Sequence, residues 1–121
     1  MLKLAIPVLH VSSSAAAEVF YCDQLGFRQE FAYRIDESRP DPCYMGLVRD
    51  DVEIHLSSFS GDGVSGGVIY MLVEDVETLH VELVAKGVTI DLKPTEQSWG
   101  NLEMYVKDAD RNSIRFVHDR R

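Results

Sequence analysis

The apolar residues of this chain fall into short blocks, and the blocks occur in the same order twice. The first block predicts a strand over Leu4–Val11, and the helix after it ends at Gly26. The second block predicts a strand over residues 68–73, and the helix after it ends at Gly87. Within this second helix, apolar residues recur at helical spacing from Val76 to Val84. Each half of the chain therefore begins with a strand and a helix.

Three more extended segments follow each helix. They are residues 27–35, 43–49 and 52–59 in the first half, and 88–92, 101–107 and 113–118 in the second. A stretch rich in glycine and serine, residues 60–66, joins the halves. The pattern predicts one α+β domain over residues 1–121, built from two βαβββ repeats at about 1–59 and 67–121.

The linker contains a formal match to a dinucleotide-binding fingerprint, Gly61-Asp62-Gly63-Val64-Ser65-Gly66. That fingerprint requires a helix directly after the glycines, so that the helix N-terminus meets the phosphates. Here the next segment reads as a strand. We therefore interpret the glycines as a flexible connection.

The charge of the chain narrows the classes of partner. The formal net charge is -8 and the isoelectric point is near 4.8, which disfavours nucleic acids and anionic membranes because their phosphates would be repelled. The chain has no apolar run long enough to span a bilayer and no signal-peptide pattern at its start. Cys22 and Cys43 are too few for a disulfide framework. We expect free thiols in a cytoplasmic protein that contacts neither nucleic acid nor membrane.

Four local sequences, taken in order, carry a family resemblance that covers essentially the whole chain. They are Pro7-Val8-Leu9, the run from Phe20-Tyr21 to Leu25-Gly26-Phe27, Val52–Ser57, and Trp99–Glu103 continuing to Asp108 and Asn112. The chain resembles the vicinal-oxygen-chelate superfamily, which comprises glyoxalase I, extradiol dioxygenases and bleomycin-resistance proteins. It looks most like the bleomycin-resistance branch, because Val48–Val52 and Trp99-Gly100 fit the sequences of that branch.

The resemblance departs from the family pattern at one turn. The family usually has proline and glycine where this chain has Ala109 and Arg111. Since a glycine would ease a positive φ angle, and asparagine tolerates one, we expect Asn112 to take that conformation.

The resemblance also implies where a metal would bind. Enzymes of the superfamily hold a divalent ion through four side chains, and those positions fall here on Ile6, His55, Val68 and Arg115. Ile6 and Val68 have no donor atoms, and Arg115 is a fixed cation. We therefore predict no metal, no cofactor and no catalytic residues. An atypical metal site built from His55 with Glu53 or Glu103 remains the alternative.

Strand alternation places aromatic and polar side chains on the sheet faces opposite the helices. The predicted ligand-binding residues are Phe31, Tyr33, His55, Tyr70, Trp99, Glu103, Tyr105 and Arg115. Taken singly, each ring is better explained by packing. Together, on a face that lacks the metal ligands, the rings and carboxylates suit a flat, partly cationic ligand.

These observations favour a non-catalytic binding protein that sequesters a bleomycin-type or similar aromatic, cationic antibiotic and so confers resistance. Two alternatives stay open: a metal-dependent glyoxalase- or dioxygenase-type enzyme with an atypical site, and a binding module for an unrelated metabolite. The resemblance further implies a homodimer in which the first strand is open to exchange. Pro7 in that strand is compatible with this, because proline in a strand marks an edge or a bulge.

Overall fold

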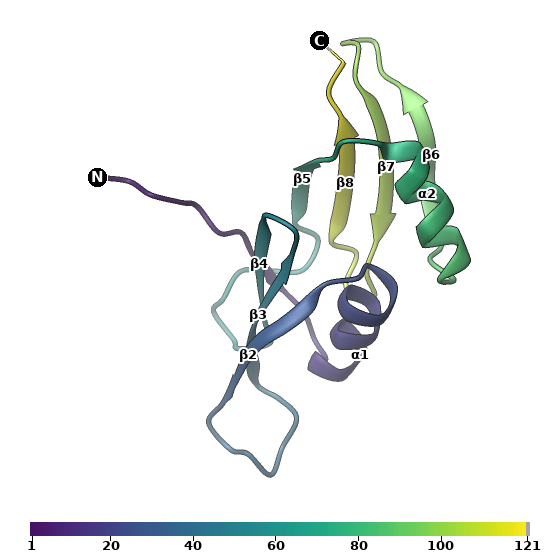
Figure 1. The fold of residues 1–121 in the computed structure, drawn as a ribbon. Helices are drawn as coiled ribbons and strands as arrows, with labels where there is room; N and C mark the ends of the chain where they lie inside the picture. Colours follow the sequence, from purple (N-terminus) through teal and green to yellow (C-terminus); the bar gives the residue numbers. More distant parts are fainter. Residues whose placement is uncertain (121) are drawn as a thin grey trace. The chain divides into compact units, whose positions relative to one another are not determined.

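The computed structural model describes residues 1–120. The chain forms two compact units, Met1–Ser65 and Gly66–Arg121, and each contains one four-stranded sheet (Figure 1). The boundary lies inside the predicted linker.

Unit 1 contains four strands and one helical segment. Its elements are β1 (Val8–His10), α1 (Ser14–Glu18), the π-helix η1 (Val19–Gln24), β2 (Arg28–Arg34), β3 (Cys43–Arg49) and β4 (Val52–Ser57). The strand order is β1-β4-β3-β2, with β1 parallel to β4 and the other pairs antiparallel. This is the predicted βαβββ order.

The first strand is shorter than predicted. It begins at Val8 instead of Leu4, and the residues before it leave the sheet as an extended arm (Figure 1). Pro7 accounts for part of this difference, because it has no N–H to donate to a neighbouring strand. Its carbonyl still accepts a hydrogen bond from the His55 N–H at 2.9 Å. The apolar arm is left uncovered, with Leu4 75% exposed.

The helical segment of unit 1 begins at a serine cap and ends at the predicted glycine. Ser13 is the N-cap, and its side chain accepts from the Ala16 N–H at 3.1 Å. The last turns widen into η1, where the Leu25 N–H reaches back five residues to the Phe20 carbonyl. Gly26 then ends the helix with φ of +78°.

Unit 2 repeats the order of unit 1. Its elements are β5 (Val68–Leu72), α2 (Val76–Ala85), β6 (Ile90–Glu96), β7 (Leu102–Lys107) and β8 (Ser113–His118), with strand order β5-β8-β7-β6. Asp75 caps α2, since its carboxylate accepts from the Glu77 and Thr78 N–H groups at 3.1 Å. Strand β6 runs to Glu96, whereas the prediction ended at residue 92. Val84 is exposed, so the predicted apolar stripe was too wide.

The turn between β7 and β8 corrects the prediction for Asn112. Arg111 takes the positive φ, at +66°, and Asn112 is fully buried. The Asn112 side chain instead accepts hydrogen bonds from the backbone N–H groups of Gly66 and Gly67 at 3.1 and 2.8 Å, and donates to Asp108 at 2.9 Å. The asparagine is therefore used for its side-chain amide, which closes the start of β5 onto this turn.

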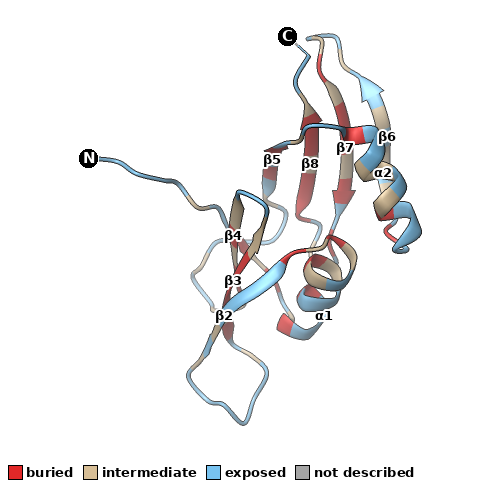
Figure 2. Ribbon diagram, viewed as in Figure 1, coloured by how far each residue is buried: buried red, intermediate tan, exposed pale blue. Residues whose placement is uncertain are grey.

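The apolar core of each unit lies on one face of its sheet. In unit 2, Ile69, Met71, Met104, Val106, Ile114 and Phe116 are buried, and α2 packs over β6, β7 and β8. Figure 2 shows this burial along β7 and β8, whereas β2 of unit 1 is largely exposed. The alternating residues point to the opposite face, which no helix of the same unit covers.

Candidate functional site: two aromatic sheet faces

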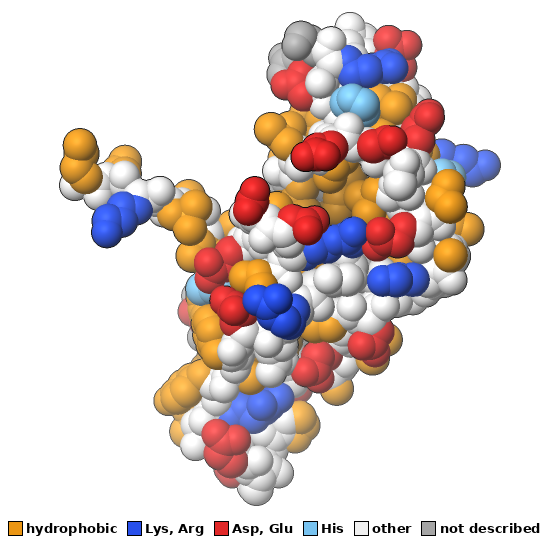
Figure 3. Space-filling view, in the orientation of Figure 1, with side chains coloured by type: hydrophobic (Ala, Val, Ile, Leu, Met, Phe, Trp, Pro, Cys, Tyr) orange, Lys and Arg blue, Asp and Glu red, His pale blue; other side chains and the backbone are white. Residues whose placement is uncertain are grey.

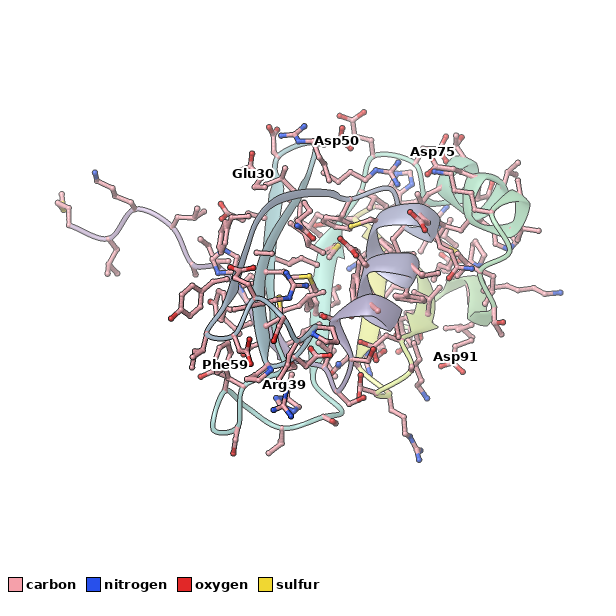
Figure 4. The ribbon with its side chains drawn as sticks, turned by 90° about the horizontal axis from the view of Figure 1, so that it is seen from below. Glu30, Arg39, Asp50, Phe59, Asp75 and Asp91 are labelled. Carbon is pink, nitrogen blue, oxygen red and sulfur yellow. The ribbon has the colours of Figure 1, made fainter. Side chains whose placement is uncertain are left out.

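An aromatic platform lies on the open face of the unit 1 sheet. Phe31 and Tyr44 are stacked with centroids 6.3 Å apart, and the edge of His55 meets both rings at 5.4 and 5.3 Å. Tyr33 stacks on Phe59 at 6.2 Å, with 17° between the planes. The side chain of Phe59 is labelled in Figure 4. Since Phe31 is 43% exposed and Tyr33 58% exposed, much of their ring surface is accessible to a ligand.

Gly46 is what allows Phe31 to lie on this face. Phe31 and Gly46 are cross-strand partners on β2 and β3, and a Cβ atom at residue 46 would come within 2.1 Å of the Phe31 ring. No side chain larger than hydrogen fits there unless the ring moves. The glycine therefore leaves the space that the Phe31 ring occupies in the platform.

A hydrogen-bonded chain runs through the same platform. The Tyr44 hydroxyl lies 2.8 Å from His55 Nδ1, and His55 Nε2 lies 2.9 Å from Glu53 Oε2. For a neutral imidazole, the carboxylate assigns the proton to Nε2, so that Nδ1 accepts from the phenol. Burial raises the pKa of Tyr44, and the charge of Asp62 raises it further, so the phenol stays protonated as a donor. Both imidazole nitrogens are thus engaged within unit 1.

A second cluster occupies the open face of the unit 2 sheet. Tyr70 on β5, Arg115 on β8 and Tyr105 on β7 are cross-strand neighbours and form one row. The Arg115 guanidinium lies 4.7 Å from the centre of the Tyr105 ring, a cation–π distance. Ile114 and Phe116, the chain neighbours of Arg115, are buried on the other face, as strand alternation predicts.

Glu103 on β7 connects the rings of this second cluster. Its Oε2 accepts from Trp99 Nε1 at 2.8 Å and from the Tyr70 hydroxyl at 3.2 Å, and its Oε1 accepts from the Tyr105 hydroxyl at 2.6 Å. Only 1% of Glu103 is exposed. Burial by itself would raise the pKa of this carboxyl, but the bonds from Tyr105, Trp99 and Tyr70, with the charge of Arg115, hold it below its ordinary value. Glu103 is therefore an ionised carboxylate that orients three aromatic side chains.

Asn101 and the turn that carries Trp99 complete the surroundings of Glu103. Asn101 Nδ2 donates to the Tyr70 oxygen at 3.1 Å, which leaves the Tyr70 proton directed at the carboxylate. The hydrogen bond to Glu103 raises the pKa of Tyr105, and burial adds to that shift. Trp99 lies in the turn closed by the bond from the Gly100 N–H to the Gln97 carbonyl, so its indole reaches Glu103 while half of its surface stays exposed.

The eight predicted ligand residues divide between the units. Unit 1 carries Phe31, Tyr33 and His55, and unit 2 carries Tyr70, Trp99, Glu103, Tyr105 and Arg115. Sequence reasoning did not name Tyr44, Phe59 and Asn101, which contact these residues. Tyr44 had a usable signal, because it alternates with the buried Cys43 and Met45 on β3. Phe59 and Asn101 also had a signal, because both fell inside predicted strands at positions that alternate with His55 and Glu103 onto the same face, although the observed strands end at Ser57 and begin at Leu102.

Comparison with known proteins places the chain in a family. A family model described as "Glyoxalase superfamily protein" matches residues 1–121, which is the whole chain. The chain belongs to the Glyoxalase superfamily. No curated protein sequence matches it.

Solved structures agree with the fold. One is a Glyoxalase/bleomycin resistance protein/dioxygenase superfamily member from Sphaerobacter thermophilus, with a TM-score of 0.74 and 21% identity over 98% of this chain and 100% of that one. A bleomycin-binding protein complexed with bleomycin gives a TM-score of 0.77 at 20% identity, over 98% and 99%. A bleomycin resistance determinant encoded on a transposon gives 0.78 at 20% identity, over 99% and 100%. At these identities the likeness concerns the fold.

The residues present do not fit the divalent ion of the superfamily's enzymes. In the part of the chain that the structure describes, no three His, Cys, Asp or Glu side chains are grouped so that they could hold a metal. His55, which occupies one expected ligand position, uses both ring nitrogens for Tyr44 and Glu53.

Among residues 1–120, no helix is long and apolar enough to cross a membrane.

Proposed function

We propose that this Glyoxalase superfamily protein binds a flat aromatic small molecule and does not transform it. The observation that carries the proposal is the exposed platform of Phe31 and Tyr33, whose rings stack on Tyr44 and Phe59 and for which Gly46 leaves room. An exposed ring that is already fixed by its neighbours loses little conformational freedom on binding, so more of the stacking energy contributes to affinity.

The proposed ligand is a bleomycin-type or similar aromatic antibiotic with cationic groups, and the proposed role is resistance by sequestration. Support comes from structural neighbours that include a bleomycin-binding protein and a bleomycin resistance determinant. The net charge of -8 favours approach of a cation, and acidic side chains are spread over the surface that Figure 3 presents. Glu53 offers a partly exposed carboxylate beside the unit 1 platform. Cys22 and Cys43 are free thiols, which supports the cytoplasm as the location.

Titration calorimetry with bleomycin tests the ligand, and two variants test the platform. Phe31→Ala and Tyr33→Ala should each weaken binding about five- to tenfold, the loss of one stacked ring. Val81→Ala, which shortens an exposed apolar side chain on α2, should leave affinity unchanged. Absence of binding at about 100 μM ligand, far weaker than sequestration requires, would remove bleomycin from the proposal.

We further propose that the protein is a homodimer in which the arm before β1 contacts the second copy. The support is the exposed apolar surface of this arm, which carries Leu2 and Leu4 at its tip. Sedimentation should give a species of twice the 13.7 kDa chain mass. Leu4→Asp should shift it toward monomer, whereas Val81→Asp, at an exposed position on α2 outside the arm, should not. A species of single-chain mass at micromolar concentration would contradict this assembly.

A further inference from the structure

Arg115 is a guanidinium that the fold leaves without a polar partner. In residues 1–120 it forms no ion pair, and its Nε is buried without a hydrogen-bond acceptor. The rest of the side chain is partly exposed on the open face of the unit 2 sheet. A buried donor without a partner is costly, so this group favours an acceptor from outside the chain.

The nearby carboxylate does not fill this role. The charge of Arg115 lowers the pKa of Glu103 through space, yet the two side chains form no ion pair. Both Glu103 oxygens already accept from Trp99, Tyr70 and Tyr105, and the carboxylate is inaccessible to solvent. Within the cluster of Tyr70, Glu103, Tyr105 and Arg115, the charge accessible to a ligand is therefore the cation of Arg115.

The surroundings of Arg115 fit a planar anion attached to a ring. Tyr70 and Tyr105 flank Arg115 in the cross-strand row. Their hydroxyls donate to Glu103, so they do not occupy the guanidinium. A guanidinium can donate two parallel N–H groups to one carboxylate, which gives both strength and orientation. We propose that Arg115 binds a carboxylate of the ligand on the open face of unit 2, with its attached ring against Tyr70 or Tyr105. The inference rests on the proposed function, because it specifies one group of the proposed ligand.

Arg115 and the acidic groups that attract a cation act at different places and over different distances. The net charge acts on approach over about a Debye length, and Glu53 is a carboxylate of unit 1. Arg115 acts at contact distance within unit 2.

Three probes that differ only in charge test the inference: 2-naphthoate, 2-naphthamide and 2-naphthylmethylammonium, each titrated into the full chain at pH 7. Trp99 is the only tryptophan, so its indole N–H gives a single resonance in a ¹⁵N–¹H spectrum, and it reports directly on the Glu103 cluster. We expect naphthoate to shift this resonance and to bind about tenfold or more tightly than the ammonium probe, with the amide between them. Equal binding of naphthoate and amide, or tighter binding of the ammonium probe, would overturn the inference and leave the proposed function standing. If none of the three probes binds and bleomycin also fails, the proposed function falls as well.

Variants of Arg115 separate charge from fold. Arg115→Gln should abolish the preference for naphthoate, Arg115→Lys should retain part of it, and Arg28→Gln, which removes an exposed guanidinium on β2, should retain all of it. The sedimentation coefficient of Arg115→Gln should match that of the parent chain. A shift to a smaller species without any naphthoate preference would identify Arg115 as a contact between copies, which would overturn the proposal.

Discussion

Replacing Glu103 with glutamine tests the carboxylate that connects Trp99, Tyr70 and Tyr105. The change keeps the shape of the side chain, but an amide has only one acceptor oxygen. The bonds from Trp99 and Tyr70 become neutral, and the Tyr105 hydroxyl has to accept from the new NH2 group, so each of the three contacts is weaker by about 1 kcal/mol. Glutamine also avoids the desolvation of a buried charge, which returns about 1–2 kcal/mol. We expect a net destabilisation of about 1–2 kcal/mol at pH 7.

The lowered pKa of Glu103 gives the sign of the pH dependence of this loss. Since the folded-state pKa of Glu103 lies below the ordinary value of 4.5, the ionised carboxylate adds stability that is fully present above pH 4.5. That stability disappears as the pH falls through the lowered folded-state pKa. The difference between parent and Glu103→Gln should therefore be largest near neutrality and shrink in acid.

Urea denaturation measured at several pH values from neutral to acidic provides the assay, with Trp99 fluorescence and circular dichroism as independent probes. Glu37→Gln, at an exposed loop position, serves as the control and should stay within about 0.5 kcal/mol of the parent at every pH. A Glu103→Gln variant as stable as the parent, or a difference that does not change with pH, would refute the reasoning. Either result would mean that desolvation cancels the contribution of the three bonds.

Three further substitutions test local features by urea denaturation. Gly46→Ala should destabilise unit 1 by about 1–3 kcal/mol because the new methyl group meets the Phe31 ring. Adding Phe31→Ala should recover part of that loss. A Gly46→Ala chain of parental stability would show that the ring moves freely. Asn112→Ala should cost about 1–3 kcal/mol by leaving the N–H groups that face its side chain without an acceptor, whereas an effect under about 0.5 kcal/mol would mean that water replaces the amide. Arg111→Gly should stabilise the chain by about 1 kcal/mol because its φ of +66° is unstrained for glycine, and a loss of stability would argue that the arginine side chain has a structural contact of greater value.

The sequence determined the element order and the sheet faces, because both depend on local periodicity. Alternation along β8 placed Arg115 opposite Ile114 and Phe116, and the helix ends at Gly26 and Gly87 followed from the need for positive φ. These features are properties of a few consecutive residues.

The tertiary structure alone decided how the site residues are used. Glu103 reads in sequence as a carboxylate on the open face of an alternating strand, yet donors from β5, from the turn before β7 and from β7 itself enclose it. The roles of Arg111 and Asn112 were exchanged because the Asn112 amide meets the backbone at Gly66 and Gly67, some 45 residues away. Hydrogen bonding between distant segments has no local periodicity, so only the folded chain shows that the carboxylate is satisfied and the guanidinium is not.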